Sequence, residues 1–219
     1  SFDTIALHSR MQYWRLSMDK LIVGFDFDRT LAHFQKVDGV KNPIDLLIKS
    51  GFSQKEAAEV YGRTRASGFS IERFISESEE VRNIDSSKLE VDLKSWVSYT
   101  LSLYSDVHEI HDHLESKGID WCIITFGNRT FQRMKIENVD LHPPLILHTD
   151  AVGRKWQPIC KLLNEYDTVV FVDDSEEELR AIASHKNCNV KLLLLDRDDI
   201  RTDSNLDRIS SLLEIKEVI

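Results

Sequence analysis

The stretch LIVGFDFDRT places two aspartates, Asp26 and Asp28, where a short apolar run ends. Burying a carboxylate is costly unless a counter-charge or a metal ion compensates it. An Asp-x-Asp pair taken alone is more often a capped turn than a site. As a site it has defined chemistry: Asp26, at the strand tip, could attack phosphorus and form an aspartyl phosphate. Asp28, in the following turn, could then protonate a leaving oxygen and later deprotonate water.

Three further polar features lie at the ends of predicted strands or at the start of a predicted helix. Thr125 ends the run IITF, Lys155 begins a helix, and Asp173 and Asp174 end the run VVFVDD. In a parallel sheet the carboxyl ends of the strands meet at one edge, so these residues would join the first two aspartates there. Four carboxylates would then face Lys155 and the nearby Arg29. Such an excess of oxygen ligands calls for a divalent cation and favours Mg²⁺.

The residues that follow the second of these strands could bind phosphate. Thr125 and the backbone of Phe126, Gly127 and Asn128 could hold phosphate oxygens. Lys155 would neutralise charge both on the nucleophile and on the transferring group.

The elements that position these residues follow from the apolar pattern. Helical patterns at residues 106–118, 157–166 and 175–186 separate short apolar runs. The alternation predicts an α/β fold, a parallel sheet with helices on both faces. Runs that are apolar on successive residues are typical of strands buried on both faces. Five runs have this character: KLIVGFDF, DWCIITF, PLILH, TVVFVDD and VKLLLLD.

Residues 42–104 break this alternation, because they read as helical throughout. We interpret them as a helical module, inserted into a core formed by residues 18–41 and 105–219, that lies over the sheet edge as a lid. Before the module, Asp38-Gly39 predicts a tight hairpin turn. Residues 1–17 are read as a natural extension or an expression remnant and carry no functional argument.

As a set, these motifs resemble the haloacid dehalogenase-like superfamily of aspartate-based phosphohydrolases. The resemblance spans residues 21–195 and rests on the order of the motifs. The superfamily's four motifs are matched by Asp26, Asp28 and Thr30 in the first, Thr125 in the second, Lys155 in the third, and Asp173 and Asp174 in the fourth.

The resemblance implies a three-layer Rossmann-like α/β core with a small helical cap that helps to choose the substrate. It also implies an Mg²⁺ ion held by Asp26, by the main-chain carbonyl of Asp28 and by the acidic pair. Asp174 would make the direct contact, with Asp173 second or through water. Dehalogenases of the superfamily lack the second aspartate, so Asp28 indicates phosphate chemistry. Arg29 departs from the pattern, since many members have glycine there, and we expect it to cover the turn rather than to contact substrate.

We therefore expect an Mg²⁺-dependent phosphomonoester phosphatase that acts through an aspartyl-phosphate intermediate. Its partner would be a phosphorylated small molecule, which we favour, or a phosphorylated protein side chain such as phosphotyrosine. Two alternatives stay open: a catalytically idle binding module of the same fold, and a phosphotransferase or phosphomutase.

Composition restricts the kinds of partner and the cellular compartment that we expect. A net charge of −9 with scattered basic residues argues against a nucleic-acid partner. No apolar run approaches the ~20 residues of a membrane span. The first residues lack a secretory signal, and the cysteines read as reduced thiols. We expect a cytoplasmic protein, with delivery as a secreted effector as the alternative.

Four residues of the helical module and one histidine-rich stretch allow two readings each. Arg63 and Arg65 could face a phosphorylated substrate or form a solvated helix end. Trp96 and Tyr99 fit core packing better than recognition, because apolar residues surround them. The stretch HEIHDH looks like a metal-ligand pattern, but on a helix a solvated face is the favoured interpretation.

Overall fold

The computed structural model describes residues 20–37, 39–66, 68–185, 189–198 and 205–219. The segment 1–17 therefore lies outside the described residues. None of the described helices is long and apolar enough to cross a membrane.

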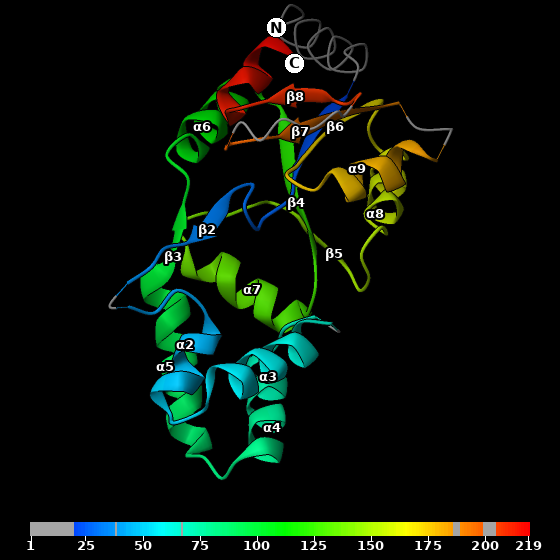
Figure 1. Ribbon diagram of the computed structural model, residues 1–219. Coiled ribbons are helices and arrows are strands. Elements are labelled where there is room, and N and C mark those ends of the chain that lie inside the picture. Colours follow the sequence, from blue (N-terminus) through cyan, green and yellow to red (C-terminus); the bar gives the residue numbers. More distant parts are fainter. Residues whose placement is uncertain (1–19, 38, 67, 186–188, 199–204) are drawn as a thin grey trace, which may run out of the picture.

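A six-stranded sheet forms the centre of the fold (Figure 1), with the strand order β5-β4-β1-β6-β7-β8. All neighbouring strands in it run parallel. The five predicted strands are confirmed. The edge strand β8 was not predicted, because its three residues carry two charges and show no apolar run. The strands are β1 (Leu21–Phe25), β4 (Asp120–Phe126), β5 (Ile146–Thr149), β6 (Thr168–Asp173), β7 (Val190–Leu195) and β8 (Asp207–Ile209).

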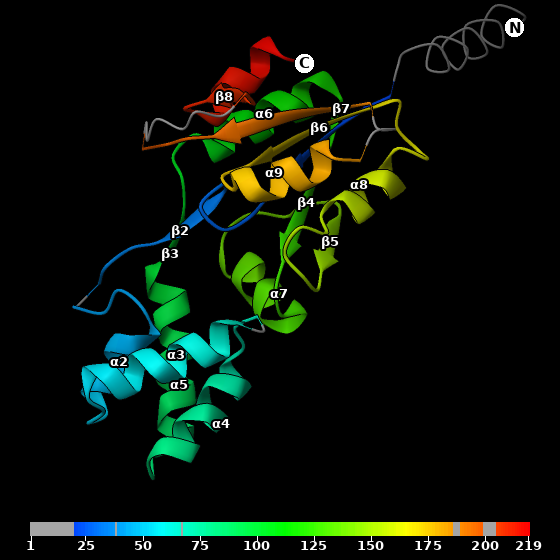
Figure 2. The same cartoon turned by 45° about the vertical axis from the view of Figure 1, so that its right-hand side comes forward.

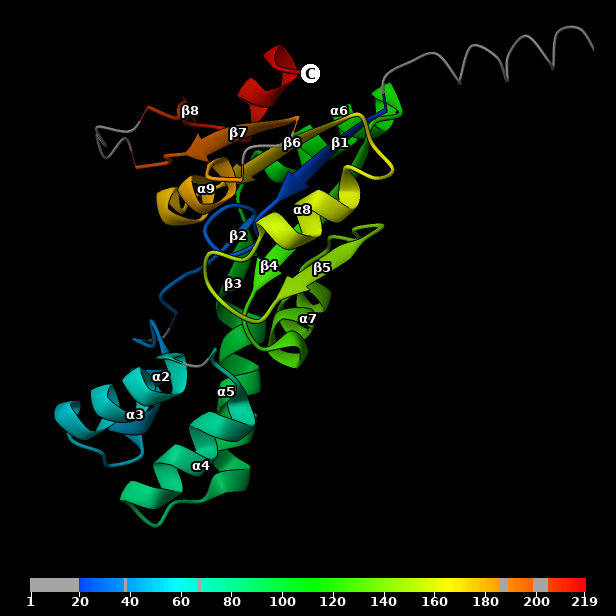
Figure 3. The same ribbon diagram turned by 90° about the vertical axis from the view of Figure 1, so that its right-hand side faces the viewer.

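Helices cover both faces of this sheet, and the three layers are visible in Figure 3. Successive side chains of a strand point to opposite faces. Accordingly, Val23 and Phe25 of β1 pack in one apolar cluster with α6, α7 and the 3₁₀ helix η1, whereas Ile22 packs in another with α8 and α9. The predicted three-layer α/β core is confirmed. The helices are α6 (Val107–Lys117), α7 (Arg129–Asn138), α8 (Trp156–Leu162), α9 (Glu176–Ala183) and η1 (Leu212–Glu217).

Local signals explain where these helices begin and end. Helix α6 ends at Gly118 in the left-handed conformation, with φ 65°, which glycine adopts at little cost. Helix α9 begins after Ser175, whose side chain accepts a hydrogen bond from the Glu178 N–H. Helix α7 was not predicted. Its N-cap residue, Asn128, accepts a hydrogen bond from the Phe131 N–H and lies two residues after the end of β4.

Four helices form a separate layer below the carboxyl edge of the sheet (Figures 1 and 2). They occupy most of the region that we interpreted as an inserted helical module, and we call them the cap. The chain reaches the cap and returns from it through two short antiparallel strands, β2 (Ala32–Phe34) and β3 (Leu101–Leu103). The cap helices are α2 (Pro43–Lys49), α3 (Gln54–Ala66), α4 (Ile71–Val81) and α5 (Ser86–Thr100).

The structure corrects three details of this region. The last cap helix ends at Thr100, because Leu101–Leu103 pairs with β2 instead of continuing the helix. The predicted hairpin is reduced to a turn in which Val37 and Val40 exchange two backbone hydrogen bonds; Asp38 itself lies outside the described residues. Core packing is confirmed for Trp96 but wrong for Tyr99, a residue of α5 that is 77% exposed.

Candidate active site

Asp26 directly extends β1 at its carboxyl end. Its N–H donates to the Val172 carbonyl at 2.9 Å, which continues the pairing of β1 with β6. The chain then turns sharply, and Arg29 adopts φ 66° at the turn. This left-handed conformation favours glycine, the residue that the resemblance leads one to expect here. The turn carries Asp28 forward, away from the strand tip.

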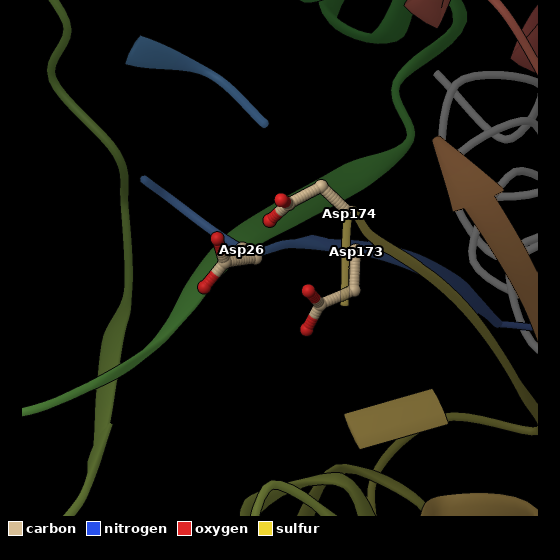
Figure 4. Close-up of side chains that lie close together, drawn as sticks. All are labelled: Asp26, Asp173 and Asp174. Carbon is tan, nitrogen blue, oxygen red and sulfur yellow. The ribbon is translucent and has the colours of Figure 1, made fainter. Parts of the chain in front are cut away.

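Asp26, Asp173 and Asp174 form an acidic cluster at the ends of β1 and β6 (Figure 4). The register of the two strands pairs Phe25 with Val172, so that the next residues, Asp26 and Asp173, emerge side by side. One oxygen from each of the three carboxylates lies within 4.8 Å of the others, and no second group of potential ligands of this kind occurs among the described residues. The stretch HEIHDH in α6 therefore forms no such site.

Lys155, at the start of α8, is the counter-charge inside this cluster. Its Nζ lies 2.6 Å from Asp26 Oδ1 and 2.7 Å from Asp173 Oδ2, and all three residues are buried. Asp173 Oδ1 also accepts a hydrogen bond from the Ser175 N–H. Both Asp173 oxygens are thus engaged by the protein, whereas Asp174 contacts Arg29 at 3.1 Å near the surface.

Burial sets the electrostatics of the cluster. It raises the pKa of Asp26 to about 7, with Lys155 opposing and the charges of Asp173 and Asp28 adding to the rise. Burial and the charge of Asp26 raise the pKa of Asp174 to about 6, against Arg29. Three carboxylates therefore share too little positive charge to stay ionised easily at neutral pH. A divalent cation would supply it, so the cluster fits an Mg²⁺ ion.

The segment after β4 lies beside this cluster. Thr125 is buried at the end of the strand. Gly127 adopts φ 120°, and its N–H donates to the Thr149 carbonyl at 3.2 Å. Among the predicted phosphate-binding residues, Gly127 therefore has its backbone donor engaged. The Thr125 hydroxyl and the backbone N–H groups of Phe126 and Asn128 remain as the candidate donors. The Asn128 side chain is not available, because its oxygen accepts the Phe131 N–H and caps α7.

Two residues on α7 hold Asp28, and sequence reasoning missed both. Lys135 Nζ contacts both Asp28 carboxylate oxygens at 2.5 Å. Gln132 Nε2 donates to Asp28 Oδ2 at 3.2 Å and to the Phe126 carbonyl at 2.7 Å. Their spacing of three places them on one face of the helix. The sequence RTFQRMKIEN carried one signal for this contact: Lys135 lies four residues after the apolar Phe131, on the same face.

Lys135 is unusual for a lysine because almost none of it reaches solvent. Its residue is 2% exposed, and its Nζ lies 5.5, 6.0 and 5.2 Å from the ring centroids of Phe27, Phe34 and Phe131. The faces of these aromatic rings and the Asp28 carboxylate compensate the lost hydration of the buried ammonium. Asp28 is therefore part of a packed ion pair on its core side, and its side chain stays partly open on the other.

A cavity of about 370 Å³ opens beside Asp28, between the cap and the core. Its core wall includes Gly127 and Lys135, and its cap wall includes Arg65 and Trp96. Arg63 and Arg65, the two arginines considered from the sequence, therefore differ in their position relative to the cavity. Arg65 lines the cavity, while the Arg63 guanidinium pairs with Glu77 at 2.6 Å and does not line it.

A family model described as haloacid dehalogenase-like hydrolase matches residues 23–194. A haloacid dehalogenase-like family hydrolase from Xanthomonas campestris has 15% identity and a TM-score of 0.64, with 92% of this chain and 91% of that chain covered. A search of curated proteins found no match.

Two further solved structures share the fold. A Bacillus subtilis protein, described as a hydrolase of the same superfamily and bound to magnesium, has 13% identity and a TM-score of 0.58, with 92% and 99% of the two chains covered. A predicted phosphoglycolate phosphatase from Haemophilus somnus has 12% identity and a TM-score of 0.58, with the same coverage. At such low identities the likeness concerns the fold alone.

Proposed function

The chain belongs to the haloacid dehalogenase-like hydrolases, and from this premise we propose that it is an Mg²⁺-dependent phosphomonoester phosphatase. The observation that carries the proposal is the pair of differently held carboxylates: Asp26 lies against Lys155, and Asp28 lies against Lys135. Removal of a halide needs no proton donor, whereas removal of an alkoxide or phenoxide does. A second carboxylate beside the nucleophile therefore favours a phosphate ester over a haloacid.

Asp26 is the proposed nucleophile. Lys155 holds its Oδ1 at 2.6 Å, which leaves Oδ2 for attack on phosphorus. The same ammonium favours the ionised form of Asp26, the form that can attack. A bond forms between Asp26 Oδ2 and phosphorus while the bond from phosphorus to the leaving oxygen breaks.

Asp28 is the proposed acid and base. In its protonated form Asp28 donates a proton to the leaving oxygen in the first step. The resulting carboxylate, which Lys135 holds, takes a proton from the attacking water in the second step. In that second step the bond between Asp26 and phosphorus breaks, which frees inorganic phosphate and restores the carboxylate. Thr125 and the Asn128 N–H would hold the phosphoryl oxygens, and Lys155 would offset the charge on them.

Asp26, Asp174 and the main-chain carbonyl of Asp28 are the proposed magnesium ligands. Asp173 would not bind the ion directly, because both of its oxygens already accept hydrogen bonds from the protein. Bound Mg²⁺ would stabilise the charge that spreads over the phosphoryl oxygens. The magnesium found in the Bacillus subtilis structure supports this choice of ion for the same fold.

A direct comparison of two substrates tests the proposal. The purified chain with Mg²⁺ is expected to release phosphate from 4-nitrophenyl phosphate and to release no chloride from 2-chloropropionate. EDTA should stop the first reaction, and excess Mg²⁺ should restore it. Chloride release in place of phosphate release would overturn the proposal in favour of a dehalogenase, and failure of both reactions would favour an idle binding module.

A further inference from the structure

We propose that the cavity beside Asp28 selects phosphomonoesters whose leaving group combines a planar ring with a second anionic group, and that Arg65 and Lys41 recognise that anion. The proposal rests on the function above, because Asp28 marks where the leaving oxygen would lie. Since Asp28 lines the cavity, the remainder of the leaving group must extend into it.

Aromatic side chains from both the core and the cap form the cavity walls. Phe34 of β2 stacks on Trp96 of α5, with ring centroids 4.3 Å apart and planes inclined by 12°. Two further lining residues, Phe69 just before α4 and Phe131 of α7, have ring centroids 4.8 Å apart. Such walls accept a flat ring by stacking or edge contact. A polyol would instead press hydroxyl groups against apolar faces, where they lose hydrogen bonds to water.

The charges of the cavity are unbalanced. Three cations line it, Lys41, Arg65 and Lys135, against the single carboxylate Asp28. Asp28 is already paired with Lys135. Lys41 and Arg65 take part in none of the ion pairs formed among the described residues. Two positive charges therefore line the cavity without an ion-pair partner among the described residues, which suits a carboxylate or a second phosphate on the substrate.

The cap loop, residues 68–70 before α4, restricts the size of the leaving group. Gly68, with φ 82°, lies so close to the core that a Cβ placed on it would be 3.3 Å from the Asn128 nitrogen. This loop therefore rests directly on the segment that follows β4. The volume of about 370 Å³ is in the range of small-ligand sites. A leaving group of this size fits the cavity as part of a free small molecule.

The test uses esters of two phenols of similar acidity, 4-(carboxymethyl)phenyl phosphate and 4-methylphenyl phosphate. We expect kcat/KM to be about tenfold higher for the carboxylated ester. Phosphoglycolate supplies an anion without a ring and is expected to be poorer than either aryl ester. A third aryl ester that carries a phosphonomethyl group decides whether carboxylate or phosphate is the preferred anion.

Matched variants assign the effect to residues. Arg65→Gln and Lys41→Gln should each reduce the preference for the carboxylated ester by about threefold. Arg63→Gln, which removes a charge two residues away but outside the cavity, should leave it unchanged. Equal kcat/KM for the two matched esters, a preference that survives in Arg65→Gln and Lys41→Gln, or faster turnover of a phosphotyrosine peptide would overturn the inference.

A binding measurement separates this inference from the proposed function. The two phenol products of these esters carry no phosphate. In calorimetry, 4-hydroxyphenylacetate should bind the wild-type chain more tightly than 4-methylphenol does. Arg65→Gln should remove that difference. If no phosphomonoester is hydrolysed but this Arg65-dependent binding is found, the proposed phosphatase fails while the assigned cavity stands. If hydrolysis occurs without the binding difference, the cavity assignment fails and the phosphatase stands.

Discussion

Lys135 holds the Asp28 carboxylate from a position 107 residues further along the chain. The ammonium is buried among three phenylalanine rings, while Asp28 also lines the cavity between the cap and the core. One side chain thus connects the position of the proposed acid and base to the packing of α7. In the acidic cluster Lys155 plays the same role for Asp26, whose carboxylate it contacts from the start of α8.

Replacing Lys135 tests whether this contact positions the proposed acid and base. Lys135→Met should lower kcat by about 10²-fold for alkyl phosphates. The loss should be much smaller for 4-nitrophenyl phosphate, whose leaving oxygen needs little help from a proton. Arg133→Gln, on the exposed side of the same helix, is the control and should leave both rates unchanged. An equal loss for both substrates would indicate a purely structural role.

Asp26→Asn should abolish turnover by at least about 10³-fold, because the amide cannot attack phosphorus. The fold should survive, since Asn is nearly isosteric and still offers an oxygen to Lys155. Steady-state phosphate release measures the first effect, and circular dichroism with thermal unfolding measures the second. Full activity in this variant would remove Asp26 from the role of nucleophile.

The metal-free protein should lose stability as the pH rises from about 4 to about 7. The pKa of Asp26 is raised from 3.8 to about 7 in the folded chain, so the folded state binds more protons than the unfolded state in this window. The free energy of unfolding therefore falls with increasing pH, by about 1–4 kcal/mol across the window.

Urea unfolding in EDTA at pH 5 and pH 7.5 measures this change. The pKa of Asp174, raised to about 6, adds to the fall in the same direction. Asp26→Asn should flatten the dependence, and Mg²⁺ should oppose it because it binds the ionised form. A free energy of unfolding that rises between these two pH values would contradict the argument.

Asp174 and Arg29 should affect magnesium binding in opposite directions. Asp174→Asn removes a proposed ligand and should raise the Mg²⁺ concentration at half-saturation by about tenfold or more. Arg29→Gln removes a competing cation, which lies 3.1 Å from Asp174 Oδ2, and should lower that concentration by about two- to fivefold. Thermal unfolding at increasing Mg²⁺ reports binding without requiring turnover. Identical titrations for both variants and the wild type would exclude Asp174 as a ligand.

Gly68 should tolerate no side chain without a change at the cavity. Gly68→Ala combines a positive φ, which costs about 1 kcal/mol for alanine, with a contact against the Asn128 backbone. It should lower kcat/KM by about tenfold or more, because the cap loop shifts relative to the residues that hold the substrate. Gly62→Ala is the control: its Cβ meets nothing within 4 Å in helix α3, so stability should rise by about 0.5–1 kcal/mol. Unchanged kcat/KM in Gly68→Ala would show that the loop does not shape the site.

Much of the fold was predictable because the apolar runs are short, continuous and separated by helical patterns. The ends of β1, β4 and β6 follow directly from that pattern, and they bring Asp26, Thr125 and Asp173 to one edge of the sheet. Other elements left no such signal. The sequence pattern of Leu101–Leu103 is helical, but in the structure these residues pair with β2 and form strand β3. Tyr99 sits among apolar neighbours in the sequence, yet α5 turns it outward.

By itself, then, the sequence determined the strand ends and the order of the four motifs. In a parallel sheet the strand ends bring the three aspartates of the acidic cluster together, because every strand delivers its last residues to the same edge. Lys155 begins α8 instead of ending a strand, and its place beside them was expected from the order of the motifs. Only the tertiary structure decided that Lys135 and Gln132 hold Asp28, and that Arg65 rather than Arg63 faces the cavity. Those contacts depend on how α7 and the cap pack against the first turn, and packing between distant segments leaves no local period in the sequence from which it could be inferred.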